Sequence, residues 1–257
     1  MRPGPPSNDV NLQGYTAMSG GWLRRTAIVL LISLAAVAPV RADRPGPEFK
    51  HLADETSTSP DRQVRIEQYL REREGDVLLQ FWVFDRKKRG SLLNPGEEAD
   101  LAGYRAGFRF SPDSRWLVRM QKTAAGFHTL LLYRRDGNRF VPAAAKPLGE
   151  LAWDYLFSLP VSEGMERHPE DAGTFNHAQV HLVKGLDDNY AWLGKRWPDS
   201  RYLVLTLSFD IQGQEKPTPW VEGWRCVYDM MTGKFSVPPD FASHNAKAVK
   251  RRDQAGR

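Results

Sequence analysis

The fold of this chain can be inferred from the stretch Ser111-Pro112-Asp113-Ser114-Arg115-Trp116-Leu117-Val118. Proline fixes φ at the second position of a turn, and the neighbouring serine and aspartate side chains bond to the local backbone. The apolar run that follows is typical of a buried strand. The pattern therefore predicts a tight turn that leads directly into a β-strand.

Similar turns occur twice more, at Ser59-Pro60-Asp61 and at Trp197-Pro198-Asp199, and each again precedes an apolar run. Every copy continues into a second apolar run and another polar turn. In the last two copies that turn contains a glycine, which accepts the positive φ of a hairpin. The chain thus contains three similar units, over residues 58–94, 107–142 and 194–238.

These units resemble the blades of TolB-type and WD40-like β-propellers, in which a Ser-Pro-Asp turn precedes one strand and a Tyr-Asp-Gly hairpin joins the next two. The resemblance implies an all-β fold, with antiparallel sheets built from propeller-like repeat units. Closed propellers typically have about four to eight blades. We therefore expect a small or partial propeller, with an open β-sandwich as the alternative. Residues 143–193 could hold a fourth, degraded unit with strands at 177–183 and 190–193.

The remaining segments complete the predicted organisation. Leu148, Leu151, Ala152 and Tyr155 recur at helical spacing, which predicts one short helix near 147–159. Residues 43–56 are rich in proline and charge, and residues 241–257 are basic. We expect a disordered linker and a flexible tail there, on either side of a single β-rich domain at 57–240.

The segment from Met18 to Ala42 has the pattern of a cleavable signal peptide. Arg24-Arg25 precedes 13 uncharged residues, 26–38, whereas a membrane span needs about 20. Val40-Arg41-Ala42 fits a cleavage site. We expect translation to begin at Met18 and residues up to Ala42 to be removed, by general secretion rather than the twin-arginine route. The mature protein would be periplasmic or secreted from a bacterium and would not span the membrane.

The net charge of +5 is concentrated at the two ends of the chain. Residues 1–42 carry four basic residues and one acidic residue, and residues 241–257 carry five and one, which leaves 27 basic and 29 acidic residues between them. Nucleic-acid binding requires a basic patch on a folded surface. We therefore expect no basic face and no nucleic-acid partner.

Two histidines, His177 and His181, lie four residues apart. On a helix this is metal-ligand spacing, but on a strand such positions lie about 13 Å apart. The flanking valines favour a strand, so no metal site is expected, and both histidines are kept as binding candidates. Glu166 and His168 precede them in a polar loop and could join such a site.

An acidic group, Glu97, Glu98 and Asp100, follows a predicted turn. A carboxylate pair can serve acid–base chemistry, although a solvated loop is the favoured interpretation. Cys226 is the only cysteine, so no intramolecular disulfide can form, and we expect it to be a buried small side chain rather than a nucleophile.

Trp220 and Trp224 are the other binding candidates, because they follow a proline-rich loop. An exposed Trp220 could stack on a sugar or on a proline of a peptide. The favoured alternative is that it packs over the edge of a sheet.

The predicted function is that of an exported, non-catalytic β-rich protein that binds a macromolecular or cell-envelope partner, either a protein or an envelope polysaccharide. No catalytic residue, cofactor or metal is assigned. The alternative is an exported hydrolase whose carboxylate and histidine residues converge from the loops 94–106 and 160–189.

Overall fold

The computed structural model describes residues 44–93, 103–124, 126–165, 176–183, 200–211 and 220–250, with backbone alone for 176–177 and 210–211. Three features of the sequence lie outside these ranges: the segment 1–42, the acidic group at 97–100 and the third Pro-Asp turn at 197–199. The loop residues Glu166 and His168 and the expected strand at 190–193 also lie outside them.

The first repeat forms a sheet of its own. Its strands are β1 (Lys50–His51), β2 (Ser57–Thr58), β3 (Val64–Arg73), β4 (Asp76–Asp85) and β5 (Gly90–Leu92). The long β3–β4 hairpin is at the centre, β5 pairs with β4, and β1 and β2 both pair with the other edge of β3. Residues 50–56, including the 3-10 helix Ala53–Glu55, are thus ordered where the sequence predicted a disordered linker.

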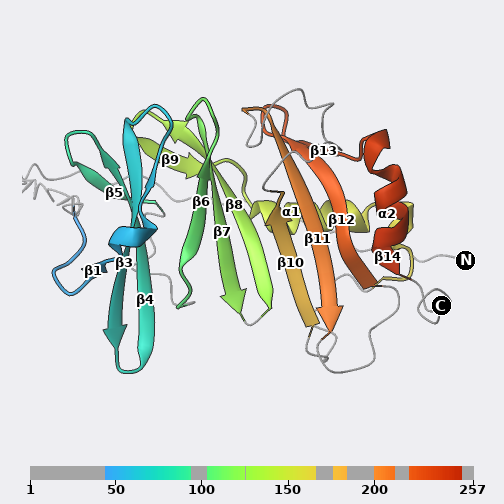
Figure 1. Ribbon diagram of the computed structural model, residues 1–257, viewed down its shortest axis with the longest axis horizontal. Coiled ribbons are helices and arrows are strands. Elements are labelled where there is room, and N and C mark those ends of the chain that lie inside the picture. The colour runs from blue at the N-terminus through green and yellow to red at the C-terminus, as the bar shows by residue number, and fades with distance from the viewer. Residues whose placement is uncertain are drawn as a thin grey trace, which may run out of the picture. The chain divides into compact units, whose positions relative to one another are not determined.

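The second and third repeats form a second, larger sheet (Figure 1). The strands of the second repeat are β6 (Ala106–Phe110), β7 (Trp116–Ala124), β8 (Phe127–Asp136) and β9 (Arg139–Pro142). Those of the third are β10 (Asn176–Leu182), β11 (Tyr202–Ile211), β12 (Trp220–Asp229) and β13 (Lys234–Ser236). Successive strands within each repeat pair antiparallel, whereas β8 and β10 pair in parallel, with Gln179 opposite His128.

Each repeat therefore contains a run of four antiparallel strands, and the predicted all-β fold of propeller-like units is confirmed. The second and third units share one sheet, whereas the blades of a propeller are separate sheets, so these two propeller-like units are not separated into blades. Strand β10, predicted as part of a degraded fourth unit, is the first strand of the third unit.

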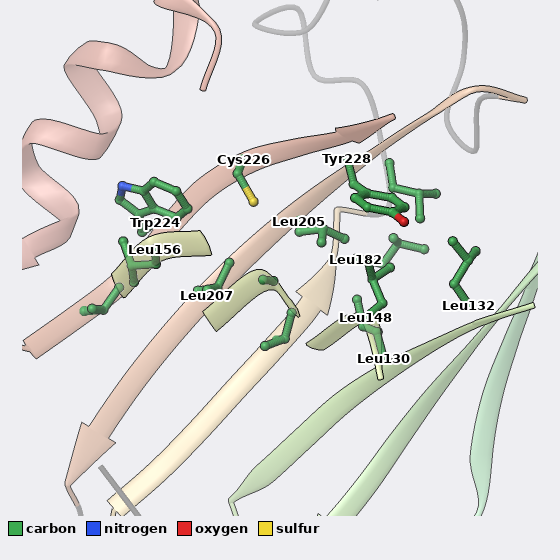
Figure 2. Close-up of a cluster of buried hydrophobic side chains, with 14 of the residues drawn as sticks. Leu130, Leu132, Leu148, Leu156, Leu182, Leu205, Leu207, Trp224, Cys226 and Tyr228 are labelled. Atoms are coloured by element: carbon green, nitrogen blue, oxygen red, sulfur yellow. The ribbon is translucent and has the colours of Figure 1, made fainter. Parts of the chain in front are cut away.

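The main core lies between the larger sheet and the predicted helix, α1 (Leu148–Phe157). Leu148, Ala152 and Leu156 recur every four residues, so they share one face of the helix, and all three are buried. Figure 2 shows two of these leucines among side chains from β8, β10, β11 and β12. A Cβ at Gly149 would collide with Thr129, so the glycine permits this close approach of α1 to β8.

The first repeat packs against the other face of the second. Leu117 and Tyr133 face each other across β7 and β8 and belong to a buried cluster that includes Phe81 of β4. Arg119 follows Leu117 on the same face and is only 2% exposed. Its guanidinium lies 4.0 Å from the centre of the Phe81 ring and donates to Gln121. The interface therefore contains buried apolar side chains and also a buried guanidinium, whose hydrogen bonds are accepted by Gln121.

Gln68 of β3 links the first sheet to the edge strand β6 of the second. The side chain, 1% exposed, donates from Nε2 to the Ala106 carbonyl at 2.7 Å and accepts the Ala106 N–H through Oε1 at 3.0 Å. Ala106 begins the edge strand β6. This residue is buried, so its N–H and carbonyl need these two bonds from Gln68. A glutamine side chain of the first repeat thus takes the place of a neighbouring strand.

The first two Pro-Asp turns have the same hydrogen-bond geometry. Ser59 Oγ donates to Asp61 Oδ1 at 2.6 Å, and Ser111 Oγ donates to Asp113 Oδ1 at 2.6 Å. Each serine oxygen also accepts the backbone N–H of the first residue in the following strand, at 3.2 Å and 2.9 Å respectively. The predicted turn-to-strand geometry is confirmed in both copies.

These two turns also contact each other. The Asp61 N–H donates to Ser114 Oγ at 3.0 Å, and Arg135 Nη1 donates to Asp61 Oδ2 at 2.6 Å. Burial alone would raise the pKa of Asp61, but hydrogen bonds from Ser59, Gln63 and Arg135 lower the pKa to about 2. The ionised carboxylate therefore ties the first repeat to the second at this end of the strands.

Residues 241–250 belong to ordered elements, whereas the sequence predicted a flexible tail from residue 241. A 3-10 helix (Pro239–Phe241), α2 (Ala242–Ala248) and β14 (Val249–Lys250) follow the third repeat. Phe241, Ala248 and Val249 are buried, and β14 pairs with the start of β12. Among the described residues, no helix is long and apolar enough to cross a membrane.

The link between the sheets predicts a specific loss of stability. In Gln68→Ala both backbone groups of Ala106 lose their partner, which should lower the free energy of unfolding by about 1–3 kcal/mol in urea titrations. Glu72→Ala, at the exposed end of the same strand, should change it by less than about 0.5 kcal/mol. Equal effects of the two substitutions would contradict the structural role of Gln68.

Candidate binding cleft

A β-bulge in β12 shapes a cleft beside helix α2 (Ala242–Ala248). Leu207 of β11 pairs with Trp224, and Phe209 pairs with Val221, so β12 has one more residue than β11 between these pairs. Gly223 lies in the bulge with φ of +70°, a left-handed conformation that favours glycine. The register of β12 thus shifts by one residue beside helix α2.

Helix α2 covers the edge of β12 and satisfies its backbone. Asn245 Oδ1 accepts the Arg225 N–H at 2.8 Å, and Asn245 Nδ2 donates to the Arg225 carbonyl at 2.7 Å. His244 Nε2 lies 2.8 Å from the Gly223 carbonyl. Because a carbonyl oxygen only accepts, the proton of the neutral imidazole lies on Nε2 and Nδ1 is an acceptor.

The cleft between β12 and α2 has a volume of about 670 Å³. It is lined by the side chains of both elements and of the turn before α2: Glu222, Arg225, Asp240, Phe241, Ser243, His244, Lys247 and Ala248. Two of these residues are acidic and two are permanently basic. The volume suits a small ligand or a few residues of a peptide.

One carboxylate of the cleft is held by its neighbours. Glu222 Oε1 accepts the indole N–H of Trp220 at 2.9 Å, and Glu222 Oε2 lies 3.7 Å from Lys250 Nζ. Trp220 and Lys250 are themselves paired between β12 and β14. The position of this carboxylate is therefore set by the strand pairing rather than by a flexible loop.

The structure places the two predicted tryptophan candidates in the main core. Trp224 is 1% exposed and Trp220 is 9% exposed. Burial of the rings leaves little aromatic surface to stack on a sugar or a proline. The indole of Trp220 instead contributes to the cleft indirectly, through its bond to Glu222.

The histidine candidates lie on β10, away from the cleft. The His181 ring is 5.0 Å from the His128 ring between ring centres, and His181 Nε2 lies 3.0 Å from Gln179 Oε1. For His177 only the backbone is described, paired with Asp210. The described part of the chain contains no cluster of three or more His, Cys, Asp or Glu side chains that could hold a metal ion.

Cys226 is buried in the main core, and this burial raises the pKa of its thiol. The thiol is therefore neither accessible nor ionised at neutral pH, in agreement with the expected structural role. Glu97, Glu98, Glu166 and His168, the other residues of the hydrolase alternative, lie outside the described ranges.

The residues of α2 could not be predicted from the sequence. The basic composition of their segment is typical of a solvated tail. Phe241, Ala248 and Val249 are the apolar residues that become buried there, but the segment is too short for helical periodicity to be convincing. The bonds of Asn245 to a strand twenty residues away leave no local pattern in the sequence.

Comparisons with known proteins give no family for this chain. No family model matches it, and no curated protein matches it significantly. Among solved structures, it is similar to oligopeptidase B from Trypanosoma brucei in a closed form with covalently bound antipain, at 14% identity and a TM-score of 0.33, covering 80% of this chain and 28% of that one.

The chain is also similar to TolB from Acinetobacter baumannii, at 10% identity and a TM-score of 0.29, covering 74% of this chain and 32% of that one. TolB-type propellers are also the family that the repeats of this chain resemble. The chain spans about a third or less of the length of either structure. At these TM-scores neither similarity indicates a function.

The contacts of α2 predict that Asn245→Ala loosens the helix. Removing both side-chain bonds leaves the Arg225 N–H and carbonyl unpaired, so residues 242–250 should exchange their amide hydrogens at least about tenfold faster. Lys247→Ala, an exposed change on the same helix, should leave the exchange unchanged. Equal protection in Asn245→Ala and the unaltered protein would contradict this role of Asn245.

Proposed function

We propose that this chain is an exported, non-catalytic β-rich protein that binds a macromolecular or cell-envelope partner, with the cleft between β12 and α2 as its binding site. The observation that carries the proposal is the cleft itself. Charged side chains of both signs surround a volume of about 670 Å³; they lie on β12, which pairs with β14, and on the helical segment that Asn245 ties to β12.

Several contacts support a binding role for this cleft. The bulge at Gly223, the two bonds of Asn245 and the bond of Trp220 to Glu222 all fix the walls of the cleft. A rigid site loses little entropy when it binds. Side chains of opposite charge favour a partner segment that carries complementary charges, such as a short stretch of polypeptide.

Export is proposed on the sequence of residues 18–42, which has the charge, apolar length and cleavage pattern of a signal peptide. The three structural units provide a stable body without any disulfide, because Cys226 is the only cysteine. Such a body suits an envelope compartment, where the mature protein would begin at Asp43.

The test is affinity capture from the envelope fraction of the protein's own source. A partner should be retained by the unaltered protein and by a control with Lys50→Gln and Arg73→Gln. Retention should fall by about tenfold or more when Arg225→Gln and Lys247→Gln remove the two cations of the cleft, because each tenfold loss corresponds to about 1.4 kcal/mol.

Equal retention by the cleft variant would contradict the assigned binding site. Release of a hydrolysed envelope component, in place of a retained partner, would contradict the non-catalytic role. Intact-mass measurement of the same preparation tests export: the expected chain begins at Asp43, whereas a mass that includes residues 18–42 would contradict cleavage.

A further inference from the structure

Four turns of the first and second repeats meet at one end of their strands. They are formed by residues 59–63, 85–89, 111–115 and 134–139, here called the four-turn face. Figure 1 shows the ends of β4, β6, β8 and the starts of β5, β7 and β9 at this end. These turns are separated in the sequence by up to 80 residues but lie beside one another in the fold.

Direct hydrogen bonds hold the four turns together. Besides the contacts of Asp61 with Ser114 and Arg135, Arg86 Nε donates to the Arg62 carbonyl at 3.2 Å. The Asn138 side chain donates to Asp85 Oδ2 at 3.3 Å. The turns therefore present their side chains from one fixed surface.

The four-turn face is strongly basic. Nine of its residues are basic and four are acidic, which gives a formal charge of +5. The basic residues are Arg62, Arg86, Lys87, Lys88, Arg89, Arg115, Arg134, Arg135 and Arg139. The near-neutral composition of the body therefore hides a segregation of charge, and the expectation of no basic face is wrong.

Three of the four acidic residues are already neutralised by the turns themselves. Asp85 is paired with Arg89 at 2.6 Å, Asp113 with Arg115 at 2.7 Å and Asp61 with Arg135 at 2.6 Å. The other six cations form no ion pair with any residue in the described ranges, and all six are exposed. Only Asp136 remains as an unpaired anion on this face. The face thus has an excess of cations available for an external anion.

The residue types on the face limit the kind of partner. None of the four turns contains an aromatic or aliphatic side chain other than proline. The face therefore has no platform for base stacking and no apolar group to insert into lipid chains. Its arginines and lysines suit phosphate groups, which accept charge-assisted hydrogen bonds. The cations also lie on the tips of four hairpins, which fits an extended anionic surface.

We infer that the four-turn face adsorbs the protein electrostatically onto a membrane surface rich in anionic phospholipid headgroups. The choice of a membrane rather than a nucleic acid as the partner rests on the proposed export. The charge of the face does not depend on it. The binding is distinct from that of the β12–α2 cleft, which contributes none of the nine cations. Each cation close to such a surface strengthens adsorption, and salt weakens it.

The test uses sedimentation of the purified protein with vesicles of phosphatidylglycerol and phosphatidylcholine, and with phosphatidylcholine alone. The face variant replaces Lys87→Gln, Lys88→Asn, Arg134→Gln and Arg139→Gln; asparagine suits position 88 because its φ is +58°. A control removes the same number of charges elsewhere, through Arg44→Gln, Lys50→Gln, Arg73→Gln and Lys122→Gln. Unfolding curves confirm that both variants remain folded.

The expected result is salt-sensitive binding to the anionic vesicles only. The face variant should bind about a hundredfold more weakly, because four favourable charges are removed, and the control should bind within about threefold of the unaltered protein. Equal loss in the control would overturn the assignment to this face, as would no binding to anionic vesicles.

Two further outcomes would also overturn the inference. Displacement from vesicles by soluble glycerol phosphate at low concentration would show a site for a single phosphate rather than a surface. Tighter binding to duplex DNA than to anionic vesicles, at the same salt concentration, would show that the face recognises nucleic acid. Because capture by the cleft is measured separately, failure here leaves the proposed function intact.

Discussion

The packing of the first repeat on the second is the constraint on which the rest of the structure depends. The first repeat is a small sheet that cannot bury its apolar face alone, and the face of β7 and β8 around Leu117 supplies the missing surface. Gln68 completes the interface by bonding both backbone groups of Ala106. Arg119 is enclosed there against Phe81, so the interface also fixes a charged group.

This packing determines where the functional surfaces lie. Since the first two repeats are aligned by their shared core, their Pro-Asp turns meet, and Asp61 accepts a bond from Arg135 across the interface. The basic turns are consequently displayed together at one end. On the third repeat, the bulge at Gly223 and the bonds of Asn245 shape a separate cleft of mixed charge. Two binding surfaces of different chemistry thus come from one set of hairpins.

Local features of the sequence were sufficient to predict the turns, strands and first helix, but not how these elements pack together. Ser111 and Asp113 predicted a turn whose bonds are now seen, and Leu148 and Ala152 predicted the helix. The basic four-turn face could not be predicted, because composition sums the charges of the whole chain, whereas the charge of a face depends on which turns become neighbours in the fold. The bond between Gln68 and Ala106 joins residues 38 positions apart, and no local pattern indicates such a pair. The candidate cleft was missed for the same reason.

If the three repeats share continuous cores, they should unfold as one cooperative unit. Native-state hydrogen exchange in increasing urea measures this directly, because it gives an opening free energy for each strand. The central amides of β4, β7 and β11 are expected to converge on one value, that of global unfolding. A markedly lower opening free energy for β4 than for β11 would contradict the arrangement, since it would show that the first repeat is not held by the second.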